Sequence, residues 1–314
     1  MTGTVQAWHV IAIAGVISFT SGFDWPTRQS VFPHLIERDD MMSAVALNSI
    51  IWQSCRMVMP AIGGLIIAWA DTWVVFALCA AGFFTMFGVI ARLRVDLPRP
   101  AVNGSTLSQV AEGLSYIATN RVFLVLISLS YAGMFFANTH MQLMPAFAAL
   151  LGGNEASYGY LISATGVGSV AGTIAVGSLQ ESRRLGAVIL SAAAASGLCI
   201  YAFCLVTAQA GAIPFAYPLA LVSVFSASFF SSIFMICSMT VLQLRVPDAL
   251  RGRVMGFHGI TYSLMPLGGL MAGTIASVTS TPVAVAIGVT CYLAIILMIA
   301  SSQREVRQIA TNEA

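Results

Sequence analysis

The chain has 314 residues, of which 58% are hydrophobic and 8% are charged, and its mean hydropathy is +0.87. A composition this apolar cannot supply the polar surface of a soluble globular protein, so it excludes that class and predicts an all-α polytopic membrane protein. The formal net charge of +2 carries little information, because the positions of basic residues matter more than their sum in such proteins.

Nine apolar segments follow one another along the chain, each long enough for the ~20 residues that a transmembrane helix needs. In chain order the predicted spans are residues 6–23, 44–69, 72–92, 122–145, 157–179, 185–207, 213–241, 254–277 and 281–300. The longest polar connection lies between the third and fourth spans. There Thr106 and Gln109 form a capping-box pattern, and Leu107, Val110, Leu114 and Ile117 form one apolar stripe. This pattern predicts a cytoplasmic linker that ends in an interfacial helix.

The basic residues are all arginines and, except for Arg56, they occur in alternate connections and in the C-terminal tail. These loop arginines are Arg28, Arg38, Arg92, Arg94, Arg99, Arg121, Arg183, Arg184, Arg245, Arg251, Arg253, Arg304 and Arg307. By the positive-inside bias, the C-terminus is cytoplasmic and the N-terminus faces out. The first 24 residues carry no basic residue that would orient the first span and no signal-peptide pattern. We therefore expect that upstream spans are absent from this chain.

A sequence repeat supports that expectation. The stretch "RMVMPAIGGL" at 56–65 returns as "SLMPLGGL" at 263–270, and each copy follows a Gln-x-x-x-Pro pattern, at Gln29 and Gln243 respectively. The repeat pairs the first two spans with the seventh and eighth, in the same direction across the membrane. Three spans precede the second copy within its half, so symmetry predicts three further spans before the first copy and twelve in all.

Longer motifs carry a family resemblance. The segments "GFDWPTRQSVFPHLIERDDMMSAVALNS", "RMVMPAIGGL", "YGYLISATGVGSVAGT" and "TVLQLRVPDALRGRVMG" resemble the major facilitator superfamily, in its branch of bacterial proton-driven exporters that includes enterobactin exporters. The resemblance implies a major facilitator fold in which the nine spans are helices 4–12 of twelve. It also implies a multi-pass protein of the bacterial plasma (inner) membrane. On this assignment we expect the family's Gly-x-x-x-Asp-Arg loop to be absent from this chain along with the first three helices.

Domain boundaries follow from the repeat and the linker. We expect a partial N-terminal half of three spans at 1–93, a linker with its amphipathic helix at 94–121, and a complete C-terminal half of six spans with a short cytoplasmic tail at 122–314.

The second predicted span carries an arginine near the middle of the bilayer. Asn48, Trp52, Arg56, Pro60 and Gly63 follow at steps of three and four, which places them on one helical stripe. A central arginine costs at least about 2.5–3.5 kcal/mol on insertion scales, so Arg56 should face a cavity or a partner. Two roles stay open for it: bonding neighbouring helices, or coupling to substrate or protons.

Polar and aromatic residues of the fourth span also share a stripe, which consists of Tyr131, Phe135, Asn138, Gln142 and Pro145. Such a mixture suits a cavity wall that faces an amphipathic compound, and satisfied interhelical hydrogen bonds are the alternative. His140, close by, is either a proton-coupling group or a hydrogen-bonding residue. Ser228 and Ser231 in the seventh span either line the cavity or allow close packing.

The two motif copies predict paired helix hinges. Each copy joins a proline, which bends a helix, to two glycines, which let a neighbouring helix approach closely. The hinge residues are Pro60, Gly63 and Gly64 in the first copy, and Pro266, Gly268 and Gly269 in the second. Gly168 and Gly172 form a G-x-x-x-G pair that predicts a helix-contact surface.

Charged residues at the cytoplasmic ends of spans have two interpretations. Asp24, Arg28, Arg251 and Arg253 either orient the helices by positive charge or form a cytoplasmic gate whose ion pairs break during transport.

The sequence leaves two functions open. The first is secondary active transport by alternating access, as a proton antiporter that exports a small amphipathic compound of the drug or siderophore type. The second is a non-transporting fragment or membrane subunit that needs a partner to supply the missing helices. The partners expected are the lipid bilayer, a small-molecule substrate and protons. No nucleic acid, cofactor or metal is expected, and the sequence contains no catalytic constellation, so an enzyme is not predicted.

Overall fold

The computed structural model describes residues 6–31, 35, 51, 54–55, 58–59, 62–67, 69–70, 72–92, 106–179 and 185–302. Every regular element within these ranges is a helix, so the all-α prediction is confirmed for the described part of the chain. Asn48, Trp52, Arg56 and Pro60 lie outside the described residues.

The chain divides into two compact units. The first consists of Met1–Trp52 and Leu78–Val102, and it contains α1 (Ala7–Val31) and most of α3 (Thr72–Arg92). Large apolar side chains of both helices are exposed, with Ile11 at 71% and Phe83 at 72%, and no side chain of α3 is buried. A helix that is apolar on all sides is stable only when lipid or other helices cover it, so this unit requires such an environment.

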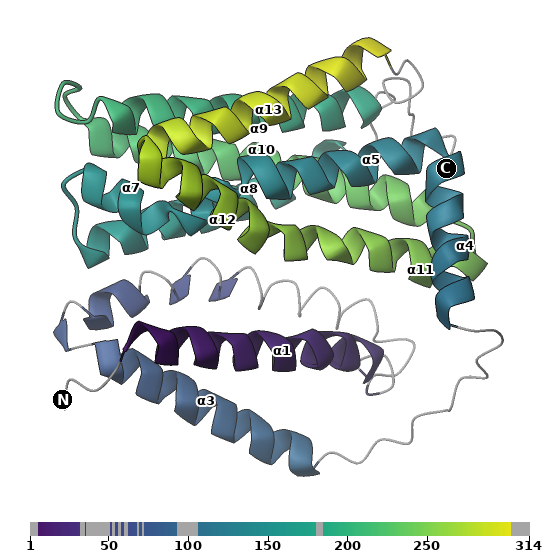
Figure 1. Ribbon diagram of the computed structural model, residues 1–314, viewed down its shortest axis with the longest axis horizontal. Coiled ribbons are helices and arrows are strands. Elements are labelled where there is room, and N and C mark those ends of the chain that lie inside the picture. The colour runs from purple at the N-terminus through teal and green to yellow at the C-terminus, as the bar shows by residue number, and fades with distance from the viewer. Residues whose placement is uncertain are drawn as a thin grey trace. The chain divides into compact units, whose positions relative to one another are not determined.

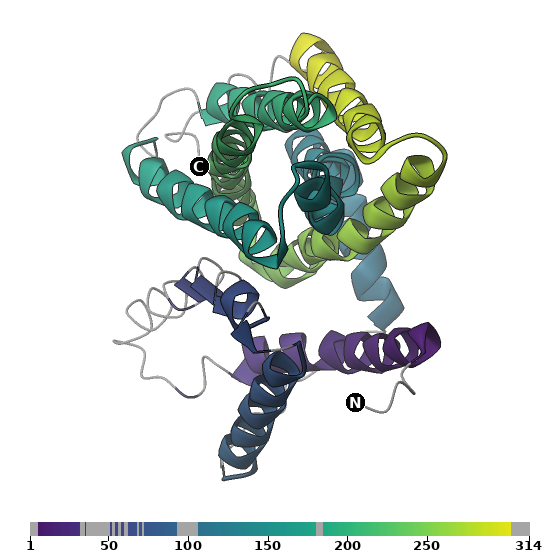
Figure 2. The ribbon, with the colours of Figure 1, turned by 90° about the vertical axis from the view of Figure 1, so that its left-hand side faces the viewer.

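The second unit consists of Gln53–Ala77 and Asn103–Ala314. Its helices are α4 (Thr106–Thr119), α5 (Arg121–Ala132), η3 (Gly133–Ala137), α6 (Thr139–Gln142), α7 (Met144–Leu150), α8 (Glu155–Leu179), α9 (Leu185–Ala208), α10 (Ala216–Arg245), α11 (Asp248–Gly259), η4 (Ile260–Ser263), α12 (Leu264–Val278) and α13 (Thr281–Ser302). Figures 1 and 2 show the helices from α5 to α13 side by side as one bundle, with α4 across one end of it.

Six helices among the described residues are long and apolar enough to cross a membrane: Thr72–Arg92, Arg121–Gln142, Glu155–Val176, Leu185–Ala208, Ala216–Gln243 and Thr281–Ser302. They match the third to seventh and the ninth predicted spans. The described apolar part of α1, Ile11–Ser21, is shorter, and most of the predicted span 44–69 lies outside the described residues. The predicted span 254–277 is divided by a 3₁₀ turn at Ile260–Ser263. The count of nine therefore stays a prediction.

Small residues set the helix spacing inside the second unit. A Cβ on Gly168 or Gly172 of α8 would overlap the backbone carbonyls of Phe225 and Phe229 on α10. The contact surface predicted for this G-x-x-x-G pair is thus confirmed, with α10 as the neighbour. A single added carbon at either glycine would force these helices apart.

The linker helix α4 packs on the bundle through a narrower face than the apolar stripe predicts. Gly113 and Ile117 are buried, one helical turn apart, whereas Val110 and Leu114 are exposed at 48% and 54%. A Cβ on Gly113 would come 3.0 Å from the Cβ of Arg253, so glycine is what allows α4 to lie close to α11. The two exposed apolar side chains remain available to a membrane interface.

Candidate functional site

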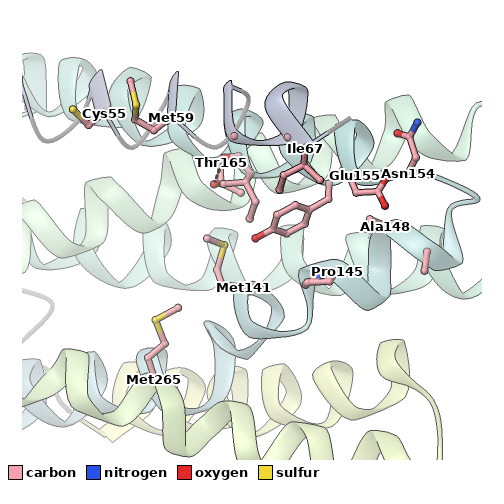
Figure 3. A pocket seen from close by; sticks show the side chains of 16 residues that line it. Cys55, Met59, Ile67, Met141, Pro145, Ala148, Asn154, Glu155, Thr165 and Met265 are labelled. Carbon is pink, nitrogen blue, oxygen red and sulfur yellow. Dashed lines mark hydrogen bonds between the residues drawn. The ribbon is translucent and has the colours of Figure 1, made fainter. Parts of the chain in front are cut away.

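A cavity of about 950 Å³ lies within the second unit, between the stretch 55–67 and the helices α6, α7, α8 and α12. Its lining consists of Cys55, Met59, Gly63, Gly64 and Ile67; Met141, Pro145, Ala148 and Ala149; Gly153, Asn154, Glu155, Tyr158, Ile162 and Thr165; and Met265 (Figure 3). The volume is at the upper end of the range of about 300–1,000 Å³ that small-molecule sites occupy. Most of the lining is apolar, as is usual for such sites.

A broken helix forms one wall of the cavity. The amide of Asn138 donates to the carbonyl of Gly133, which gives the π-helical turn η3 at Gly133–Ala137. Pro145 lacks an N–H for the carbonyl of Met141, and its ring would clash there in a continuous helix, so α6 ends and α7 begins at Met144. Met141 and Pro145 both line the cavity. Broken helices at membrane depth are tolerated where they line a cavity or are buried in protein.

The connection between α7 and α8 lines part of the cavity through Gly153 and Asn154. Asn154 caps α8, since its Oδ1 accepts hydrogen bonds from the Ser157 amide at 3.1 Å and from the Ser157 hydroxyl at 3.2 Å. Gly152 adopts a φ of +70°, which suits glycine. The Tyr217 hydroxyl donates to the Ser157 carbonyl at 2.9 Å and ties the start of α8 to α10. These bonds hold Glu155 and Tyr158 of the first turns of α8 at the cavity.

The first motif copy contributes to the lining through glycine. A Cβ on Gly64 would lie 3.1 Å from the carbonyl oxygen of Glu155, so the stretch approaches the N-terminus of α8 closely. Gly63 has open space around it. Besides Gly64, the described lining residues of this stretch are Cys55, Met59, Gly63 and Ile67, each four residues from the next, so they form one helical stripe. That stripe shares only Gly63 with the one predicted around Arg56.

The predicted stripe of the fourth span lies mainly in helix contacts. The Tyr131 hydroxyl donates to the Phe257 carbonyl at 2.6 Å, and Asn138 Nδ2 lies 3.0 Å from Met134 Sδ. The carbonyl of Phe135 and the side chain of Gln142 meet the glycines of α12. Of this stripe, only Pro145 is among the lining residues of the cavity.

His140, Ser228 and Ser231 also lie away from the lining. His140 is only 4% exposed, its Nδ1 lies 2.9 Å from the Ala137 carbonyl, and its Nε2 has no hydrogen-bond partner among the described residues. Ser228 and Ser231 of α10 are half-buried. Proton coupling by His140 and a place for Ser228 and Ser231 in the cavity wall therefore stay predictions.

The second motif copy packs tightly against the broken helix. A Cβ on Gly268 would overlap the carbonyl oxygen of Phe135, and one on Gly269 would lie 2.8 Å from Cγ of Gln142. Pro266 stands in the first turn of α12, where its ring would clash with the carbonyl of Tyr262 in a continuous α-helix. The 3₁₀ turn at Ile260–Ser263 accommodates this proline. Movement at this point, which the hinge prediction requires, stays a prediction.

One predicted gate residue has a defined partner. Arg253 of α11 forms an ion pair with Glu112 of α4. Glu112 was not among the gate residues predicted from the sequence. Asp24 and Arg28 belong to α1 in the first unit, and Arg251 belongs to α11 in the second. Asp24 is exposed and takes part in a further interaction. This ion pair joins α11 to the linker helix within the second unit, and the gate itself stays a prediction.

Several cavity residues were not predicted from the sequence: Cys55, Met59, Met141, Glu155, Tyr158, Thr165 and Met265. Most are side chains that also suit a helix core, so no pattern distinguishes them. Glu155 has one available signal, because it is the only carboxylate in the sequence between Glu112 and Glu181. No group of three or more His, Cys, Asp or Glu side chains within the described ranges is placed to hold a metal ion.

Comparison with known proteins identifies the family of this chain. The profile of the family described as "transmembrane secretion effector", part of the major facilitator superfamily, matches residues 1–313. The chain is 26% identical over 224 residues to the enterobactin exporters EntS of Shigella boydii serotype 18 and of Escherichia coli O139:H28. The match covers 71% of this chain and 52% of each relative, so the chain spans about half the length of the curated relatives it matches. The matched profile covers nearly the whole sequence, and the chain belongs to the transmembrane secretion effector family of the major facilitator superfamily.

Proposed function

We propose that this protein is a secondary active transporter that exports a small amphipathic compound in exchange for protons. The observation that carries the proposal is the cavity of about 950 Å³, which is lined on one side by the first motif copy and on the other by α6, α7, α8 and α12. In transporters built from parallel repeats, the substrate site lies between the repeats, which rock around it. The names of the relatives support export as the direction.

The proposed cycle uses the residues at both ends of the bundle. By the arginine distribution, the connection between α7 and α8 is on the outer side, and α4, the start of α11 and the C-terminus are on the cytoplasmic side of a bacterial inner membrane. Opening toward the cytoplasm would separate Arg253 from Glu112, together with any pairs that Asp24, Arg28 and Arg251 form. The prolines and glycines of the two motif copies would supply the bending that this movement needs.

Proton coupling requires a group within the membrane that binds and releases a proton. His140 is the candidate for binding and releasing the proton, and Arg56, whose guanidinium stays protonated, is the candidate for holding a negative charge on the substrate or on a proton-binding group. Of these two residues, only His140 is among the described ones. It is buried, and its Nε2 has no hydrogen-bond partner among the described residues. Neither motif nor geometry suggests a catalytic group, and the family and its relatives point to a transporter rather than an enzyme.

Everted inner-membrane vesicles from a strain without its own drug exporters would test this function. Vesicles that contain the full chain should accumulate ethidium when respiration acidifies their interior, and an uncoupler should abolish this accumulation. Arg56→Ala should lower the rate by at least tenfold with the protein still present in the membrane. Equal accumulation in vesicles with and without the protein, for ethidium and for neutral and anionic aromatic probes alike, would refute the transport proposal.

A further inference from the structure

The charge on the cavity lining is negative and comes from one carboxylate, and this limits the class of compound that the cavity accepts. Among its described lining residues, Glu155 is the only charged one, and the polar remainder is small: Asn154, Tyr158 and Thr165. The sulfur atoms of Met59, Met141 and Met265 come from three separate segments of the chain (Figure 3). The surface is therefore apolar and polarisable, with one negative charge at one end.

We propose that the cavity binds cationic or neutral aromatic amphipaths, and that Glu155 sets the preference for positive charge. This inference rests on the proposed transport function and names the substrate class of the same site. The carboxylate of Glu155 forms no ion pair or hydrogen bond with any described residue, so its charge is available to a ligand. Glu155 is exposed, and an anionic ligand would instead place a like charge next to its carboxylate, which disfavours binding.

The three methionines are the reason for proposing an aromatic ligand. Methionine side chains are flexible and make favourable contacts between sulfur and aromatic rings, and binding surfaces that accept varied partners use them often. Tyr158 adds an aromatic side chain to the lining, three residues after Glu155 on α8. A cation over a tyrosine ring is attracted by the ring's quadrupole, so Tyr158 and Glu155 favour the same ligand charge.

Glu155 has a competing structural role that the experiment must separate. It stands in the first turn of α8, where a negative charge stabilises a helix N-terminus. Loss of that effect would weaken the helix and slow the transport of every compound, whatever its charge. A role in charge selection would instead change the ratio of rates between cationic and neutral probes.

The test measures three probes in the same vesicles: ethidium as a permanent cation, N-phenyl-1-naphthylamine as a neutral aromatic and 2,3-dihydroxybenzoate as an anion. The unmodified protein should transport the first two and not the third. Glu155→Gln should lower the ratio of ethidium to N-phenyl-1-naphthylamine transport by about tenfold, which corresponds to about 1.4 kcal/mol. Glu155→Asp should keep most of the ratio, and Glu313→Gln, a carboxylate change near the end of the chain, should leave it unchanged.

The outcomes distinguish this inference from the function on which it rests. Transport that prefers the anion, or a ratio that Glu155→Gln leaves unchanged, would overturn the inference and leave transport intact. An equal fall for all probes with Glu155→Gln would assign Glu155 to helix stability alone and would likewise overturn it. Absence of transport for every probe in the unmodified protein would refute the proposed function itself.

Discussion

The contact between Gly268 of α12 and the backbone of Phe135 offers a sharp test of the helix packing. In Gly268→Ala the new Cβ would overlap the Phe135 carbonyl oxygen, and it would lie 2.9 Å from the carbonyl carbon and 3.1 Å from Cα. Carbon atoms attract each other best at separations of about 3.5–4.0 Å, so α12 must move away from Phe135 by on the order of 1 Å. Overpacking of this kind costs about 1–3 kcal/mol, whereas the gain in helix propensity returns about 0.5–1 kcal/mol.

At the middle of both ranges, the net destabilisation expected for Gly268→Ala is about 1 kcal/mol, which lowers Tm by about 2–4 °C. Gly273→Ala is the matched control, because it lies on the same helix and a Cβ there meets nothing within 4 Å. Its Tm should stay equal or rise slightly. Both variants would be purified in the same detergent and heated, with the surviving monomer measured by size-exclusion chromatography. Equal Tm values for the two variants would refute the close approach of α12 to the broken helix.

Two further polar contacts yield predictions of smaller size. Tyr131→Phe removes the hydrogen bond to the carbonyl of α11 and should destabilise the protein by about 0.5–1.5 kcal/mol, visible as a lower Tm in the same assay; an unchanged Tm would contradict that bond. Arg253 and Glu112 have side chains that are 28% and 58% exposed, so a double-mutant cycle with Arg253→Gln and Glu112→Gln should yield a coupling of about 0.2–1 kcal/mol that weakens as salt is added. A salt-independent coupling above about 2 kcal/mol would mean that the pair is shielded from solvent.

The packing of α4 shows where sequence periodicity stops being informative. The apolar stripe predicted a helix at the right place, and α4 does span Thr106–Thr119. Periodicity cannot tell a face that packs on protein from one that meets lipid, because both are apolar. The buried face contains Gly113, which no hydrophobic pattern marks, since its role is to let the backbone approach Arg253.

The candidate site illustrates the same limit. Prolines and glycines of the two motif copies stood out in the sequence, and Gly63 and Gly64 of the first copy do line the cavity, as does Pro145 of the fourth span. Polar residues of the fourth span stood out as well, yet Tyr131 and Gln142 lie in helix contacts, because a polar side chain in an apolar span is equally suited to either place. Glu155 lines the cavity because the connection between α7 and α8 places the first turn of α8 there, which no sequence pattern indicates.

The sequence by itself determined the class of this protein and much of its order along the chain. A hydrophobic content of 58% leaves no alternative to helices in a membrane, and runs of about 20 apolar residues mark where such helices cross it. Which side chains meet in space depended on the tertiary structure. The gathering of Met59, Met141, Glu155 and Met265 around one cavity depends on breaks in helices and on glycine contacts between residues far apart in sequence. The energy of those contacts comes from shape complementarity across helices, which no local pattern records.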